Sequence, residues 1–131
     1  MSFVLRLSRH PARLDARHPR LIEDLLELAA AGQQEAVNAM IEMLADFHER
    51  GLDSRFLRKL KGYPVWELKT QSRGGLKGGS RIYFFFGGKN TVILVNAESK
   101  EGNVPDARKL SEAIEIFGAY RQGIPVTKEE S

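Results

Sequence analysis

The chain has 131 residues, of which 42% are hydrophobic and 28% charged, and its formal net charge is +3. This composition is typical of one small globular domain, so we expect a single domain over residues 1–131, with 124–131 as a frayed tail. The sequence has no cysteine, which excludes disulfides, thiolate zinc sites and cysteine nucleophiles. No apolar run approaches the roughly 20 residues of a membrane span, and no signal-peptide core precedes the first charges, so we expect a cytoplasmic protein.

The first half of the chain predicts one strand and two helices. Apolar and polar residues alternate within residues 3–8, which indicates a short strand. Apolar stripes at helical spacing then run over 19–31 and 34–50, and Gly32 and Gly51 end them. Two helices joined by so short a loop should form an antiparallel hairpin.

The second half predicts three strands and a final helix. Aromatic and β-branched runs cover residues 65–70, 81–86 and 91–97, and a turn joins the last two runs. A helix follows from about residue 105 to 122. The predicted fold is therefore α+β, in the order β-α-α-β-β-β-α. We expect a three- or four-stranded, mainly antiparallel sheet, with the helical hairpin on one face and the last helix near its end.

Strand alternation assigns side chains to the two faces of this sheet. The residues expected in the core are Trp66, Ile82, Phe84, Phe86, Ile93, Val95 and Ala97. The residues expected on the outward face are Glu67, Lys69, Arg81, Tyr83, Asn96, Glu98 and Lys100.

Charge is sorted along the chain. Residues 23–49 contain seven acids and no lysine or arginine, whereas residues 55–81 contain eight basic residues and one acid, Glu67. A segment this basic attracts a polyanion, and RNA is the first candidate. The alternative is a solvated basic face that only keeps the protein soluble.

The outward face gathers groups that suit a phosphodiester. Arg81, Lys69 and Lys100 could bind the phosphate and stabilise developing negative charge, and Glu67 could move the proton of a 2′-hydroxyl. We take these four as catalytic candidates. The alternative is that Glu67 and Lys69 are ordinary exposed strand residues and that Arg81 is a structural ion-pair partner of Glu67.

A glycine-rich segment over residues 71–80 carries Arg73 and Lys77 and suggests a basic hairpin tip. It lacks the lysine–serine/threonine ending of a phosphate-binding P-loop. We take Arg73 and Lys77, with Lys61 and Tyr83, as RNA-binding candidates. No metal-ligand spacing is visible, so we expect neither a metal nor a cofactor.

Two motifs, Val65-Trp66-Glu67-Leu68-Lys69 and Ser80-Arg81-Ile82-Tyr83-Phe84, are followed by a hydrophobic strand, Lys100 and a proline-initiated helix. This series, over about residues 57–121, resembles the RelE/ParE toxin superfamily, and its HigB-like, phage-derived branch in particular. The chain departs from the family's pattern at Lys69, where the family has arginine, and at Glu101, where it has a second lysine.

The resemblance implies a toxin of a type II toxin–antitoxin pair. It implies an RNA endonuclease that cuts mRNA on the ribosome without a metal, and a cognate antitoxin, of the helix-turn-helix type, as a further partner. Two other classes stay open: a non-enzymatic toxin that binds a protein target, as ParE-like members do, and a phage-derived accessory protein that shares only the fold.

Overall fold

The computed structural model describes residues 3–70, 79–99 and 106–128 and confirms an α+β fold. Its helices and strands run in chain order as β1 (Val4–Leu7), α1 (Arg20–Ala30), α2 (Gln34–Arg50), β2 (Leu57–Lys59), β3 (Trp66–Lys69), β4 (Ser80–Phe86), β5 (Thr91–Ser99) and α3 (Ala107–Arg121). Short 3₁₀ turns occupy Pro11–Arg13 and Gly51–Asp53.

The strands form one five-stranded sheet in the order β1-β5-β4-β3-β2. The expectation of three or four strands was wrong, because β2 pairs with β3 at one edge although its sequence, Leu-Arg-Lys, has no apolar alternation. The other edge strand, β1, runs parallel to β5, and the remaining pairs are antiparallel.

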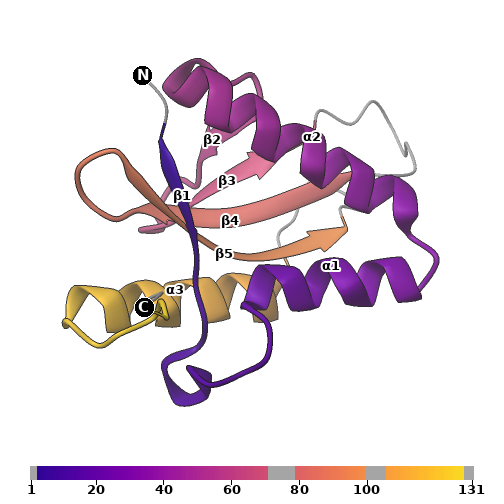
Figure 1. Cartoon of the computed structure of the whole chain (residues 1–131). Coiled ribbons are helices and arrows are strands. Elements are labelled where there is room, and N and C mark those ends of the chain that lie inside the picture. The colour runs from indigo at the N-terminus through magenta and orange to yellow at the C-terminus, as the bar shows by residue number, and fades with distance from the viewer. Residues whose placement is uncertain (1–2, 71–78, 100–105, 129–131) are drawn as a thin grey trace.

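Helices cover both faces of this sheet, as Figure 1 shows, with α2 on one side and α3 on the other. The α1–α2 hairpin packs on a core that includes Met40, Phe47, Leu68 and Phe84. The last helix was expected near the end of the sheet, but α3 lies across the second face and forms a second core there with Tyr83, Phe85, Ile93 and Val95, among others. Both faces of β4 are therefore buried.

A β-bulge explains which of the expected core residues changed face. Ile82 and Phe84 lie in the hairpin core and Trp66 packs against it, as expected. On β5, however, Leu94 pairs with Phe84 and Asn96 pairs with Tyr83, so Val95 is an extra residue between them. Such an insertion reverses the alternation. Ile93 and Val95 are buried, but against α3 and not in the hairpin core.

The C-terminal segment is more ordered than its sequence suggests. Val126 is buried, and its carbonyl oxygen accepts a hydrogen bond from the backbone N–H of Arg9 at 2.6 Å. The expected fraying from residue 124 therefore does not apply to the segment up to Val126. No helix in the three described ranges is long and apolar enough to cross a membrane.

Close packing between α3 and the β4–β5 turn gives a first prediction. A Cβ added at Gly87 would lie 2.9 Å from Ile93 Cγ1 and 3.0 Å from Tyr120 Oη, whereas one added at Gly118 in α3 would meet nothing within 4 Å. We expect Gly87→Ala to lower the free energy of unfolding by about 1–3 kcal/mol through overpacking. Gly118→Ala should raise it by about 0.5–1 kcal/mol, because alanine favours the helix. Urea unfolding of both variants checks this, and equal effects would contradict the packing described.

Candidate functional site

Two rows of cross-strand neighbours bring the sequence-predicted residues together on β3, β4 and β5. Arg81 pairs with Lys69 on one side and with Glu98 on the other. One row away, Tyr83 pairs with Glu67 on β3. These residues share the face of the sheet that α3 covers.

Four of these side chains form a connected polar group, which we name the Arg81 cluster: Glu67, Arg81, Tyr83 and Glu98. Arg81 Nε lies 2.6 Å from Glu67 Oε2, an ion pair that is not aligned as a hydrogen bond. Arg81 Nη1 donates to Glu98 Oε1 at 2.9 Å, and the Tyr83 hydroxyl donates to Glu98 Oε2 at 3.3 Å. One guanidinium is thus held between two carboxylates.

The Arg81 cluster is buried, and the expectation of an outward-facing site was wrong. Arg81 is 1% exposed and Tyr83 0%, while Glu67 and Glu98 are 4% and 9% exposed. The physical reason is the position of α3, which buries the second face. Its N-cap also closes over the cluster, because the backbone N–H of Asp106 donates to both carboxylate oxygens of Glu98 at 3.2 Å. The ion pair between Arg81 and Glu67 is the structural alternative that the sequence left open.

Burial controls ionisation in the cluster. Desolvation raises the pKa of Glu98, although the Asp106 N–H and Arg81 oppose it. Desolvation also raises the pKa of Tyr83, with help from the charge of Glu98, so the phenol stays protonated. Burial alone would lower the pKa of Arg81, but its acidic neighbours raise it above its ordinary value and keep the guanidinium charged.

The other sequence-predicted residues are not part of this group. Lys69 is only partly exposed and forms no ion pair with any residue that the structure describes. Lys61 is exposed in the β2–β3 turn, and Tyr83 is buried, which closes it to RNA in this conformation. Lys100, Arg73 and Lys77 lie outside the described residues. The sequence predicted that Glu98 lies on the same face as Arg81, but Glu98 was not among the predicted site residues. Its cross-strand pairing with Arg81 could have identified it.

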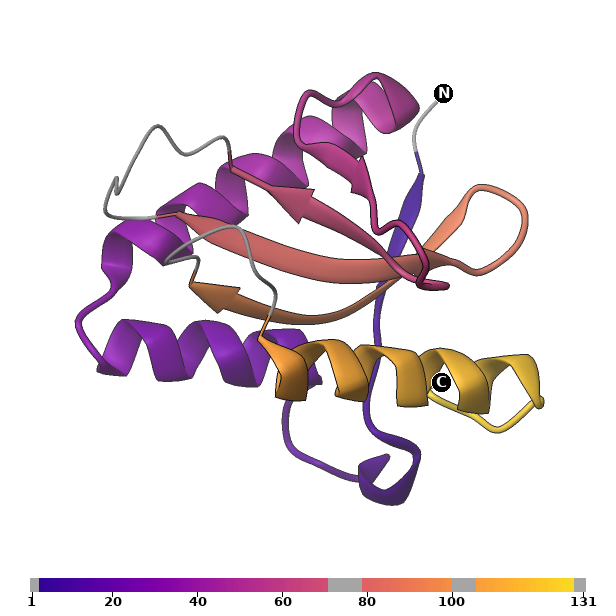
Figure 2. The same cartoon turned by 180° about the vertical axis from the view of Figure 1, so that it is seen from behind.

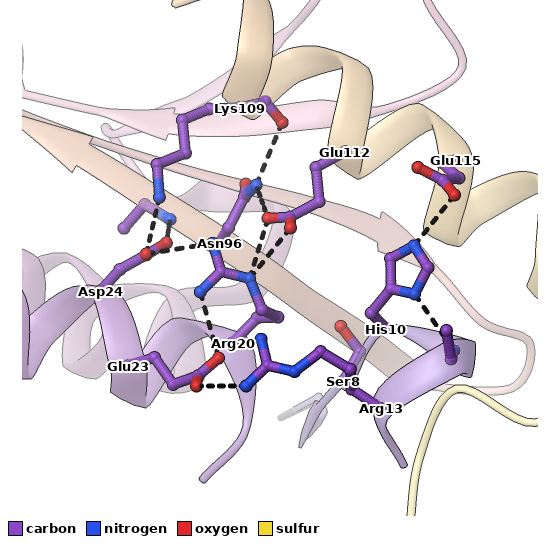
Figure 3. Close-up of polar contacts among 12 residues, drawn as sticks. Ser8, His10, Arg13, Arg20, Glu23, Asp24, Asn96, Lys109, Glu112 and Glu115 are labelled. Atoms are coloured by element: carbon purple, nitrogen blue, oxygen red, sulfur yellow. Dashed lines mark hydrogen bonds and ion pairs between the residues drawn. The ribbon is translucent and has the colours of Figure 1, made fainter. Parts of the chain in front are cut away.

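A second polar network, drawn in Figure 3, holds α3 against α1 and β5. Asp24, which is buried, accepts from the Ala97 backbone N–H at 2.9 Å and from Lys109 Nζ at 2.6 Å. Arg20 Nε donates to both carboxylate oxygens of Glu112 at 3.0 Å. The expected outward residue Asn96 is also buried, and its amide donates to Glu112 Oε1 at 2.8 Å. This network fixes the helix that covers the Arg81 cluster.

The described ranges 3–70, 79–99 and 106–128 contain no group of three or more histidine, aspartate or glutamate side chains that could hold a metal ion. The chain matches no protein-family model, and its comparison with curated proteins gives no match. The resemblance to RelE/ParE toxins therefore remains a prediction from the sequence.

The network in Figure 3 predicts how stability depends on pH. Burial opposes the ionisation of Glu112, but hydrogen bonds from Arg20 and Asn96 outweigh it and hold its pKa below the ordinary 4.5. The Glu112 carboxyl therefore binds a proton more readily in the unfolded chain than in the folded chain. As pH falls below about 4.5, the contribution of Glu112 to the free energy of unfolding is lost. We expect Glu112→Gln to cost about 1–3 kcal/mol at pH 7 and to approach the unmutated protein as the medium is acidified.

Thermal melts between pH 7 and pH 3 provide the measurement. Glu115→Gln is the matched control on the same helix, because Glu115 is mostly exposed and its one ion pair among the described residues is with His10. Its effect should stay below about 0.5 kcal/mol. A pH-independent difference between Glu112→Gln and the unmutated protein would contradict the argument.

Proposed function

We propose that this protein is a toxin of the RelE/ParE type that cuts mRNA in the cytoplasm without a metal. Two things support the proposal: the sequence segments that resemble the family, and a strand-and-helix order that differs from the expected one only by the additional strand β2. The observation that carries it is the Arg81 cluster, where a charged guanidinium lies between two carboxyls and the pKa of one of them is raised. Perturbed ionisation of this kind is typical of functional sites.

The reaction proposed is an internal transfer at a phosphodiester. The 2′-oxygen attacks the adjacent phosphorus, and the bond from phosphorus to the 5′-oxygen of the next nucleotide breaks. The products are a 2′,3′-cyclic phosphate and a free 5′-hydroxyl. Glu67 accepts the proton of the 2′-hydroxyl, and protonated Glu98 returns a proton to the leaving 5′-oxygen. Arg81 stabilises the charge that develops on the phosphate oxygens.

The described conformation is a closed one for this chemistry. A phosphate can reach the Arg81 guanidinium only where a carboxylate gives way, and Glu98 is held in place by the Asp106 N–H at the start of α3. The proposal therefore requires that the first turn of α3 moves when RNA binds.

The decisive variant is Glu98→Gln, because it keeps the size of the side chain and can still accept from Arg81. We expect the rate of mRNA cleavage on programmed ribosomes to fall by about 10²-fold or more, as removal of general acid–base catalysis typically does. The pH–rate profile should lose the limb that Glu98 supplies. An unchanged profile would remove Glu98 from the reaction.

Arg81→Ala and Arg81→Lys complete the test. Losing a charge donor in the transition state costs about 10²–10³ in rate. Removing Arg81 also leaves the buried carboxyl groups of Glu67 and Glu98 without their cation, which costs about 3–5 kcal/mol, so folding must be checked by circular dichroism in each case. Folded Arg81 variants that cut as well as the unmutated protein would make Arg81 structural.

A second candidate is a non-enzymatic toxin that binds a protein target. The burial of the Arg81 cluster favours it, because residues of a protein core need no access to RNA. This second candidate would be supported if the unmutated protein cuts no RNA on or off the ribosome, yet still arrests growth. Either toxin implies a cognate antitoxin as partner.

A further inference from the structure

The turn between β2 and β3 carries cations that have no acidic partner among the described residues. Lys59, at the end of β2, and Lys61, in the turn, are both exposed. No residue in the described ranges forms an ion pair with either of them. Glu67 is the one acid between residues 54 and 70, and it points inward to Arg81. The local charge is therefore positive on the outside.

Neighbouring arginines differ from these lysines because they are already engaged. Arg55 pairs with Glu42 at 3.2 Å and stacks over the Phe56 ring. Arg58 donates from Nη1 to the backbone oxygens of Arg55 and Leu57. Among the described residues of this β-hairpin, Lys59 and Lys61 are the exposed lysines, and Lys69 on β3 is only partly exposed.

Aromatic rings accompany the lysines. Tyr63 is 45% exposed, in the same turn as Lys61. The Lys59 ammonium lies 5.7 Å from the centre of the Trp66 ring, which is half-buried. Figure 2 shows the tip of this hairpin at the same end of the sheet as the β4–β5 turn.

The turn presents Tyr63 on a constrained backbone. Gly62 has φ +86°, in the left-handed region, and Pro64 fixes φ on the other side. The backbone N–H of Tyr63 donates to the Leu60 oxygen at 3.1 Å. Because this backbone is already constrained, stacking of the exposed ring on a ligand costs little additional backbone entropy.

Lysines on an edge strand also discourage pairing with other sheets, and β2 is such an edge. That role accounts for Lys59. It does not account for an exposed tyrosine and a further lysine beyond the end of the strand. Cations beside exposed aromatic rings are the combination that binds single strands, whose bases stack and whose phosphates are neutralised.

We propose that Lys59, Lys61, Tyr63 and Trp66, named here the β2–β3 surface, bind single-stranded RNA. Tyr63 stacks on a base, and the two lysines contact the flanking phosphates. The choice of RNA over DNA rests on the proposed function. The surface is separate from the Arg81 cluster, which lies beneath α3.

The test measures binding without cleavage. The ligand is a fluorescein-labelled 2′-O-methyl RNA of mixed sequence, whose blocked 2′-oxygen cannot attack phosphorus. Fluorescence anisotropy gives the Kd as a function of salt. Trp66 is the only tryptophan of the chain, so its emission gives a second, label-free signal. We expect RNA to quench it.

Charge reversal tests the lysines. Lys59→Glu/Lys61→Glu should weaken binding at least about tenfold and reduce the slope of log K against log salt by about 1.4, since each phosphate contact contributes about 0.7. Arg17→Glu/Arg108→Glu is the matched control, because it changes net charge equally at exposed residues before α1 and on α3. Equal losses in the two double variants would overturn the localised site.

Tyr63→Ala tests stacking. We expect its affinity to fall by about fivefold or more with the salt slope unchanged, because stacking is not a charge effect. No loss in a folded Tyr63→Ala variant would overturn the aromatic platform. Tighter binding of duplex RNA would do so too, because paired bases cannot stack on the ring.

Two further ligands separate the alternatives. Single-stranded DNA of the same sequence that bound as tightly as the RNA would overturn the assignment to RNA. Polyglutamate that competed as well as RNA would show that an acidic protein segment is the partner.

These experiments also distinguish RNA binding from the proposed enzyme activity. Binding to the 2′-O-methyl RNA without any cleavage activity would contradict the proposed endonuclease alone. Cleavage that continues without binding at this surface defeats the present inference alone.

Discussion

A buried carboxylate, Asp24, joins the parts of this molecule that are far apart in sequence. β1 pairs with β5 only as far as Leu94, so the same edge of β5 has no strand beside it beyond that point. Asp24 lies there and accepts from the Ala97 N–H, which would otherwise be an unsatisfied buried donor. The same carboxylate binds Lys109 of α3 at 2.6 Å. One side chain thus holds α1, the central part of the sheet and α3 together.

Because α3 is held on the second face, the residues beneath it experience the low polarity of a protein interior. Arg81 loses its hydration there, and only paired carboxylates make that burial tolerable. Glu67 and Glu98 supply them from the strands on either side. The same burial raises the pKa of Glu98 above that of an exposed carboxylate, although Arg81 and the Asp106 N–H oppose the shift. The contacts that make the burial of one arginine tolerable are therefore also the contacts that perturb the ionisation of Glu98.

Apart from β2, the order of helices and strands could be predicted from the sequence, because each of the others is marked by local signals. Glycines end α1 and α2, and β-branched and aromatic runs mark β3, β4 and β5. Strand alternation also placed Arg81, Tyr83 and Glu98 on one face correctly. It could not show that the face is covered, because the position of α3 depends on contacts such as Lys109 with Asp24, 85 residues apart. The bulge at Val95 was equally hidden, since no glycine or proline marks it.

Folding changes the charge distribution that the sequence suggests, because several charges of the acidic and basic segments form ion pairs. Three acids of the helical hairpin form ion pairs within the molecule: Asp24 with Lys109, Glu42 with Arg55 and Asp46 with Arg50. The basic segment is divided: Arg55 and Arg81 form ion pairs, whereas Lys59 and Lys61 form none with the residues that the structure describes. Two opposed charged faces are therefore not what folding produces. Folding pairs several of these charges within the described residues and leaves Lys59 and Lys61 without a described ion partner, near the exposed Tyr63 and the half-buried Trp66. Long-range attraction of a polyanion acts on charges that remain unbalanced.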